Sequence, residues 1–297
     1  MTVHLDPKKR HDFILLFDVQ DGNPNGDPDA GNAPRVDAET QKGLVTDACI
    51  KRKIRNYISI AGSDIFPENK RDRAKIYVEE GSILNKQHER AYTALKLTSK
   101  NSKGKRQTDS KIIDPVREWM CDNFFDIRMF GAVMTTEINA GQVRGPVQFV
   151  FGRSIDPIAP MEIAVTRCAA TNASEDKENK TMGRKWIVPY GLYRSHGFFN
   201  PALAEQTRVD EDDLAIFWKA LINMFECDRS AARGLMSIQG LWVFTHECKW
   251  GNAPAHKLFN LVELHSQVEI PRSFDDYEVK LPSREALPPG VTLNQLG

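Results

Sequence analysis

The sequence predicts an α+β fold with the order strand, helix, strand, strand, helix, strand, the split βαβ arrangement of ferredoxin-like proteins. Three observations predict it. A short apolar run at residues 12–19, bounded by Asp and Gly, is typical of a buried strand. Two segments, 46–61 and 210–226, carry apolar residues at helical spacing behind capping residues. The other strands are expected at residues 146–151, 162–169 and 240–247.

The first helix is expected to be apolar on one side and cationic on the other. Thr46 supplies an N-cap and Asp47 a first-turn acid, and Gly62 can end the helix. Successive residues turn by 100°, so the basic residues that follow Ile50 are expected on the opposite face. The apolar positions are Ile50, Ile54, Tyr57, Ile58 and Ala61, and the basic positions facing away are Lys51, Arg52 and Arg55.

A loop of Gly, Pro, Asn and Asp about twenty residues long joins the first strand to this helix, and loops of that length are usually functional or disordered. We interpret it as a binding loop because both its ends are anchored. The run from Asp21 to Gly26 fits the first half of a calcium-binding loop, but Asn32 stands where a bidentate Glu is required. The loop acids are therefore expected to be turn residues or solubilising charges rather than metal-bound nuclease carboxylates; they are Asp21, Asp27, Asp29 and Asp37.

Residues 63–111 interrupt the pattern and are interpreted as a basic, partly mobile insertion with one short helix near 86–97. The 40 basic and 40 acidic residues of the whole chain balance to a net charge of zero. Residues 40–111 nevertheless hold 17 basic and 8 acidic side chains, and both flanks are acidic. Such asymmetry is typical of a chain that meets a polyanion along one surface.

Beyond the insertion, a helix is expected to begin at Asp114-Pro115, followed by a Gly-rich segment at 139–145. Between residues 171 and 200, a polar stretch leads into a segment at 182–200 that is dense in Gly and aromatic residues, which indicates an extended arm or hairpin. The second long helix carries Asp210 and Asp213 at capping-box spacing. The tail from about residue 250 contains several Pro residues and is expected to be a loosely ordered strand-and-loop appendage.

Several classes of protein are disfavoured by composition. Five scattered cysteines without a CxxC pair argue against a zinc ribbon or a disulfide framework. No apolar run near the N-terminus is long enough for a signal peptide or a membrane span, so a cytoplasmic protein without membrane contact is expected. HExxH, GxSxG, Walker and GxGxxG motifs are missing, and nothing in the sequence demands an enzyme, a metal or a cofactor.

The strongest chemical signal is the cluster of Lys51, Arg52, Lys53 and Arg55, which suits contact with phosphates. A solvated helix face is the usual alternative for a charge run. The Gly-rich loop before the cluster and further basic residues after it favour polyanion binding. In the aromatic-rich segment, Trp186 beside Arg184 and Lys185 is suited to stacking on bases, although such aromatics are more often part of a core.

Six blocks in one order carry a family resemblance: FDVQDGNPNGDP, VTDACIKRKIR, DIRMFG, RGPVQF, MGRKWIVPYGLYRSHGFFNP and ALINMFECDRSAARG. Spread over residues 12–248, they resemble the CRISPR-associated backbone subunit of type I-C Cascade complexes, within a repeat-associated RNA-binding superfamily of ferredoxin-like proteins. The resemblance implies a hand with an RRM-like palm, an inserted finger region and a thumb hairpin. The implied bounds are 1–61, 113–170 and 196–297 for the palm, 62–112 for the finger and 171–195 for the thumb.

The resemblance also implies partners. Copies of the chain would stack head-to-tail along one guide RNA (crRNA), gripping its backbone, and a thumb would interrupt the guide at intervals. The target DNA strand would pair with the guide. Other Cascade subunits, namely the large, the small and the repeat-processing subunit, would complete the complex.

Thirteen residues follow as candidates for contact with the guide, and none as a catalytic residue. The RNA-binding candidates are Lys51, Arg52, Lys53, Arg55, Arg128, Gln142, Arg144, Arg233, Asn25 and Gly26, and the thumb candidates are Arg184, Lys185 and Trp186. Backbone subunits of the related type III complexes cut RNA with an Asp of the first loop. A metal-dependent ribonuclease that uses Asp27 or Asp29 is therefore the alternative interpretation.

Overall fold

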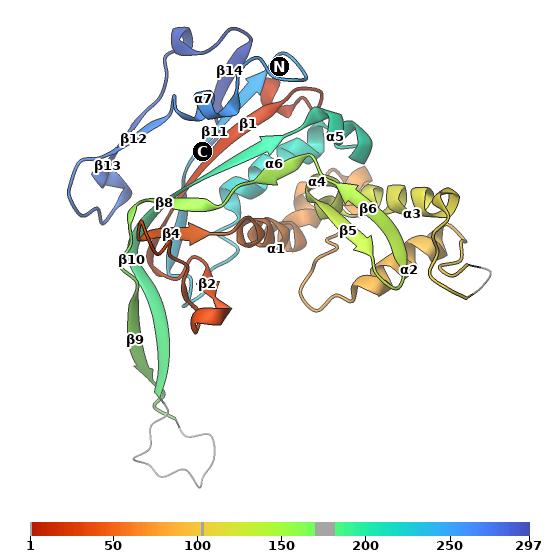
Figure 1. The fold of residues 1–297 in the computed structure, drawn as a ribbon, viewed down its shortest axis with the longest axis horizontal. Helices are drawn as coiled ribbons and strands as arrows, with labels where there is room; N and C mark the ends of the chain where they lie inside the picture. Colours follow the sequence, from red (N-terminus) through yellow and green to blue (C-terminus); the bar gives the residue numbers. More distant parts are fainter. Residues whose placement is uncertain (1, 102–103, 170–181) are drawn as a thin grey trace.

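The computed structural model describes residues 2–101, 104–169 and 182–297. Its centre is an antiparallel sheet with the strand order β14-β11-β1-β10-β8-β4 (Figure 1). Elements in the order strand, helix, strand, strand, helix, strand occur as β1, α1, β8, β10, α6 and β11, but β8 and β10 are not the two strands expected at 146–151 and 162–169. The sheet strands are β1 (His11–Gly22), β4 (Lys42–Val45), β8 (Gly152–Pro157), β10 (Met182–Phe199), β11 (Leu235–His246) and β14 (Val291–Gln295).

The central strand β1 is buried on both faces, as its uninterrupted apolar run predicts. Phe13, Leu15 and Phe17 point into a core that they share with the helices. Ile14 and Leu16 point into a second core on the other face. Because side chains alternate along a strand, this one run organises two layers of the molecule.

Two long helices cover the first face of the sheet. Helix α1 (Asp47–Ile65) is capped by Thr46, whose Oγ1 accepts from the amide of Cys49, as expected. The capping box of α6 (Glu211–Asn223) forms between Asp210 and Asp213, as its spacing predicts. Helix α1 does not end at Gly62 but continues to Ile65. Gly62 is buried there, where a Cβ would lie 3.2 Å from that of Ala74.

The second face is covered by the C-terminal segment, which corrects the expectation of a loosely ordered tail. Leu258, Phe259 and Val262 are buried against this face, and β14 adds a strand at the edge of the sheet. Within the described residues, no helix is both long and apolar enough to cross a membrane. The further elements of this segment are α7 (Ala255–Phe259), β12 (Glu263–Ser266), η4 (Phe274–Asp276), β13 (Tyr277–Lys280) and η5 (Arg284–Ala286).

A separate, smaller core lies beside the sheet and gives the expected insertion a defined structure. It unites Tyr92, Met120 and Val143, so it extends well beyond residue 112 into what was expected to be palm. The helix expected at Asp114 begins at Ser110 under an Asp109 cap, and the Gly-rich segment at 139–145 is a strand. The elements are η3 (Glu68–Ala74), α2 (Leu84–Ala94), α3 (Ser110–Asn123), α4 (Phe125–Phe130), β5 (Gly131–Thr135) and β6 (Asn139–Arg144).

Strand β10 serves two structures. Its first part, residues 182–187, pairs with β9 (Met161–Thr166) in a hairpin that projects from the body (Figure 1). From Val188 onward it pairs with β1. The strand expected at 162–169 is thus an exposed hairpin strand, and β8 takes its place in the sheet. Of the segment expected as a thumb, residues 171–181 lie outside the described residues and 188–195 lie in the sheet.

Shorter elements complete the chain. The strand expected at 146–151 is present as β7, which pairs with the end of β10. The loop before α1 contains a two-strand ladder rather than irregular backbone alone. These elements are η1 (Val3–Leu5), β2 (Gly26–Asp27), η2 (Pro28–Ala30), β3 (Ala33–Pro34), β7 (Val147–Phe149) and α5 (Pro201–Thr207).

Candidate nucleic-acid interface

The loop before α1 is fastened to the start of that helix by Asn25. Its Oδ1 accepts from the amide of Thr46 at 2.9 Å and from the hydroxyl at 3.0 Å. Next to it, a Cβ on Gly26 would lie 2.0 Å from Oδ1 of Asn32, so a larger residue there would displace the Asn32 side chain. The structure therefore gives both predicted residues a part in shaping the loop, which also lies against β10 through β3.

The four cations of α1 that are predicted to contact phosphates are not equally exposed. Lys53 is buried and ion-paired with Asp228, and burial lowers the pKa of its ammonium group. Arg55 donates to Asp126 at 2.8 Å, and Lys51 pairs with Asp47 at 3.0 Å; both side chains are mostly buried. Only the side chain of Arg52 is well exposed, at 63%.

Arg52 pairs with Glu80 at 3.0 Å, but the Glu80 side chain is 85% exposed. An ion pair in solvent contributes little free energy. A phosphate can therefore replace Glu80 at small cost. Of the four helix cations, Arg52 is the one that the structure leaves accessible to an external anion.

Arg233 joins the same junction from the far end of the chain. Its guanidinium lies 3.4 Å from Asp228, the partner of Lys53, and donates to the carbonyl of Asn23 at 3.3 Å. Asp228 thus brings two of the predicted cations together. Since one acid faces two cations, this junction keeps a positive charge beside the loop and α1.

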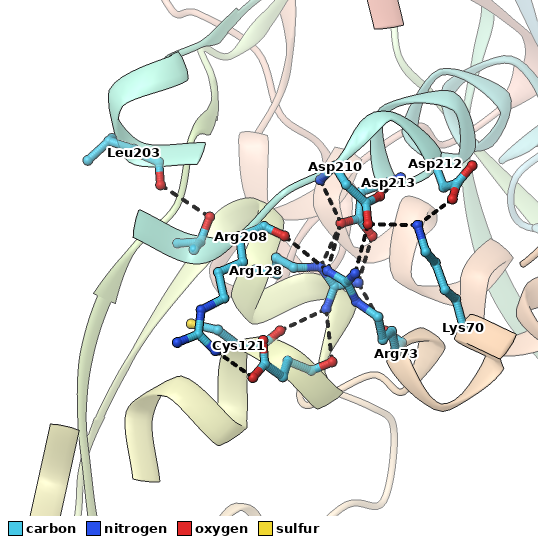
Figure 2. Close-up of polar contacts among 11 residues, drawn as sticks. Lys70, Arg73, Cys121, Arg128, Leu203, Arg208, Asp210, Asp212 and Asp213 are labelled. Carbon is cyan, nitrogen blue, oxygen red and sulfur yellow. Dashed lines mark hydrogen bonds and ion pairs between the residues drawn. The ribbon is translucent and has the colours of Figure 1, made fainter. Parts of the chain in front are cut away.

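Arg128, a predicted RNA-binding residue, is fully buried, and Figure 2 shows the polar contacts of its side chain. Its guanidinium binds the carboxylate of Asp213 in two hydrogen bonds of 2.9 and 2.7 Å. It also donates to the carbonyls of Cys121 and Arg73. Arg73 and Lys70 extend the network to Asp210 and Asp212. Arg128 joins the smaller core to α6 and has no free donor surface.

Gln142 and Arg144 are exposed side chains of β6, at a groove of about 530 Å³ between α3 and α5. Two other arginines line this groove. Arg117 pairs with Asp114, and Arg208 pairs with Glu118 and Asp122. In the described part of the chain, Arg144 has no such acidic partner, so it is the available cation of this groove.

The predicted thumb residues lie on the projecting hairpin. Arg184 is 75% exposed and pairs with Glu162 on the facing strand at 3.1 Å. Lys185 stands opposite Ile163, and Trp186 opposite Glu162. Both are half-buried. The structure places these three residues on one strand, apart from the junction around α1.

The loop acids take part in turns and ion pairs. Asp27 accepts from the amide of Asp29 and pairs with Arg35 at 3.3 Å. Hydrogen bonds, first of all from Arg153, lower the pKa of Asp37 to about 2. Among residues 2–101, 104–169 and 182–297, no group of three or more His, Cys, Asp or Glu side chains is placed to hold a metal ion.

Comparison with known proteins decides the family. The model of the family described as CRISPR-associated protein Cas7 matches residues 9–282. The chain belongs to the Cas7 family. A Cas7 protein of Haloferax volcanii is 25% identical over 278 residues, which cover 86% of this chain and 75% of the relative.

A solved structure shares the fold of this Cas7 chain. A chain of a structure titled CRISPR RNA-guided surveillance complex, pre-nicking, has a TM-score of 0.51 at 14% identity, over 79% of this chain and 78% of that one. A second structure, titled CRISPR RNA-guided surveillance complex, has a TM-score of 0.43 at 12% identity, over 79% and 68% of the two chains.

Sequence reasoning found the cations of this Cas7 chain but missed the acids that bind them. Asp228 lies 175 residues from Lys53, and Asp126 lies 71 residues from Arg55. One signal was available for Lys53, which follows Ile50 by three residues. Helical spacing puts positions i and i+3 on the same face, here the buried one.

Proposed function

We propose that the chain is a guide-RNA-binding backbone subunit of a type I-C CRISPR Cascade complex for antiviral defence. The observation that carries this proposal is the Cas7 family match over residues 9–282. The type I-C assignment rests on the sequence blocks described above. The solved complex with the same fold is titled as RNA-guided, which supports RNA as the ligand.

In this proposal the guide runs past the start of α1 and along the hairpin. Arg52 and the junction around Arg233 offer charge to phosphates, and Arg184, Lys185 and Trp186 contact the guide from the hairpin. The loop with Asn25 bridges the two sites, because Asn25 accepts hydrogen bonds from Thr46, the N-cap of α1, and the loop lies against β10. A grip on phosphates accepts any guide sequence.

The sheet with its two helices serves as an RRM-like palm, the smaller core as the finger region and the β9–β10 hairpin as the thumb. Copies stack head-to-tail on one guide and present its bases to the target DNA strand. The large, small and repeat-processing subunits complete the complex in the cytoplasm. Guide binding, not catalysis, is the proposed role.

Binding measurements test whether the protein holds RNA through its phosphates. We expect Arg52→Ala and Lys185→Ala to weaken affinity for RNAs of unrelated sequence alike, and each lost phosphate contact to flatten the salt dependence by about 0.7 in the log–log slope. Lys257→Ala, an exposed lysine of α7, is the matched control and should leave the affinity unchanged. A loss confined to one RNA sequence would contradict a backbone grip.

The same preparations test the ribonuclease alternative. Guide-loaded protein is incubated with complementary RNA, with and without Mg²⁺, and the products are separated on a gel. We expect intact RNA in both. Cleavage that requires Mg²⁺ and disappears in Asp27→Asn or Asp29→Asn would establish the nuclease function instead.

A further inference from the structure

A groove of about 620 Å³ lies on the sheet face opposite α1 and α6, at the edge formed by β4 and β8. Gly152 faces the helix side, since a Cβ there would contact Phe17 and Val45. Its neighbours Phe151 and Arg153 therefore face the groove. The C-terminal segment covers the centre of this sheet face but leaves this edge open, with Phe259 as the boundary.

A β-bulge aims Phe151 out of the sheet. From Phe149 to Arg153 the chain advances four residues, while the paired stretch of β10, from Gly197 to Arg194, advances three. Two hydrogen bonds hold the bulge at Val150. Its amide donates to the carbonyl of His196, and its carbonyl accepts from Ser195 Oγ. Phe151 is 48% exposed as a result. Bulges commonly re-aim a side chain beside a functional site.

Three cationic residues line the groove together with Phe151: Lys42, Arg153 and Arg194. Lys42 has no ion-pair partner within the described part of the chain, and Arg153 is 56% exposed beside Asp37. Arg194 is held by the carbonyl of Val262 at 2.9 Å and donates through Nε to His196. The His196 ring stacks on Phe259 with centroids 4.2 Å apart. The side chains of Arg194 and His196 are thus held in place. With three cations and one acid, Asp37, the groove carries a net positive charge.

We propose that this groove binds an unpaired nucleotide of a single-stranded nucleic acid, with its base on Phe151 and its phosphates at Lys42 and Arg153. An aromatic face beside cations is the usual chemistry for single strands. RNA-recognition motifs place such aromatics on their central strands. Here the corresponding face, including Leu16 and Leu192, is buried under the C-terminal segment. The exposed aromatic lies at the sheet edge instead.

The inference rests on the proposed function only for the class of ligand. The test measures fluorescence anisotropy with labelled oligouridine and oligothymidine, on free and on guide-loaded protein. Phe151→Ala should weaken binding by about 5- to 150-fold, the range for one lost base stack, and Phe151→Tyr should restore it. Lys42→Gln should flatten the salt slope by about 0.7. Val133→Ala, also an exposed apolar residue, is the control.

The two oligonucleotides distinguish a guide RNA from a DNA strand as the ligand of the groove. Loss with oligouridine on free protein assigns the groove to the guide; loss with oligothymidine on guide-loaded protein assigns it to a DNA strand. Equal affinity of wild type and Phe151→Ala in both arms overturns the inference, as does an effect on subunit assembly alone. If Arg52→Ala weakens RNA binding while Phe151→Ala does not, the proposed function stands and the groove assignment fails.

Discussion

Arg128 and Arg52 show how burial decides what an arginine does in this chain. Arg128 has no exposed surface, and Asp213 together with backbone carbonyls engages its guanidinium. Arg52 has one partner in solvent and keeps the rest of its donor surface free. The residue type is the same at both positions. The difference depends on Asp213, 85 residues away, which no local pattern reveals.

Replacing Arg128 by Met should destabilise the fold by about 3–5 kcal/mol, because it leaves the Asp213 carboxylate buried without its partner. Urea denaturation followed by circular dichroism measures the change. The exposed arginine of β6 provides the control, and Arg144→Met should stay within about 0.5 kcal/mol of wild type. Equal, small effects of both substitutions would show that the Arg128 pair does not join the two cores.

Among the elements, the long and capped ones could be predicted from the sequence. Strand β1 and helices α1 and α6 carry their own signals in an apolar run, an N-cap and a capping box. Strand β8 is six residues long and β14 is five, and each forms by hydrogen bonding to a neighbouring strand of the sheet. Their residues have no periodic pattern of sufficient length, so pairing across the sheet, not local preference, decides them.

His11 fastens β1 to its surroundings in the neutral state. One ring nitrogen lies 2.9 Å from the carbonyl of Asp6 and the other 3.0 Å from the hydroxyl of Thr245 on β11. Burial lowers the pKa of His11 to about 4. The unfolded chain, with a histidine pKa near 6.5, therefore binds more protons between these values, and stability falls as the pH decreases from about 6.5 to 4.

The expected slope from His11 is at most about 1.4 kcal/mol per pH unit in that window. Urea midpoints at a series of pH values between 7.5 and 4.5 measure it. His11→Gln should flatten the pH dependence, whereas substitution of the exposed His265 should not. An unchanged slope in His11→Gln would contradict the role of this group.

At the scale of the whole molecule, helices cover one face of the central sheet and the C-terminal segment covers the centre of the other face. The sequence predicts the first covered face through its amphipathic helices. It does not predict the second, because the C-terminal segment consists of short elements that pack only in the folded chain. For the same reason the sequence predicts which cations are candidates for the site. Ion pairs with acids that are distant in the sequence determine which of these cations stay accessible.

The central claim is that copies of this chain assemble along one guide RNA. Mass photometry of the protein mixed with guide RNAs of increasing length tests it most directly. The account predicts that the number of bound copies rises in proportion to RNA length and does not depend on sequence. A fixed number of copies at every length, or binding to one sequence alone, would contradict it.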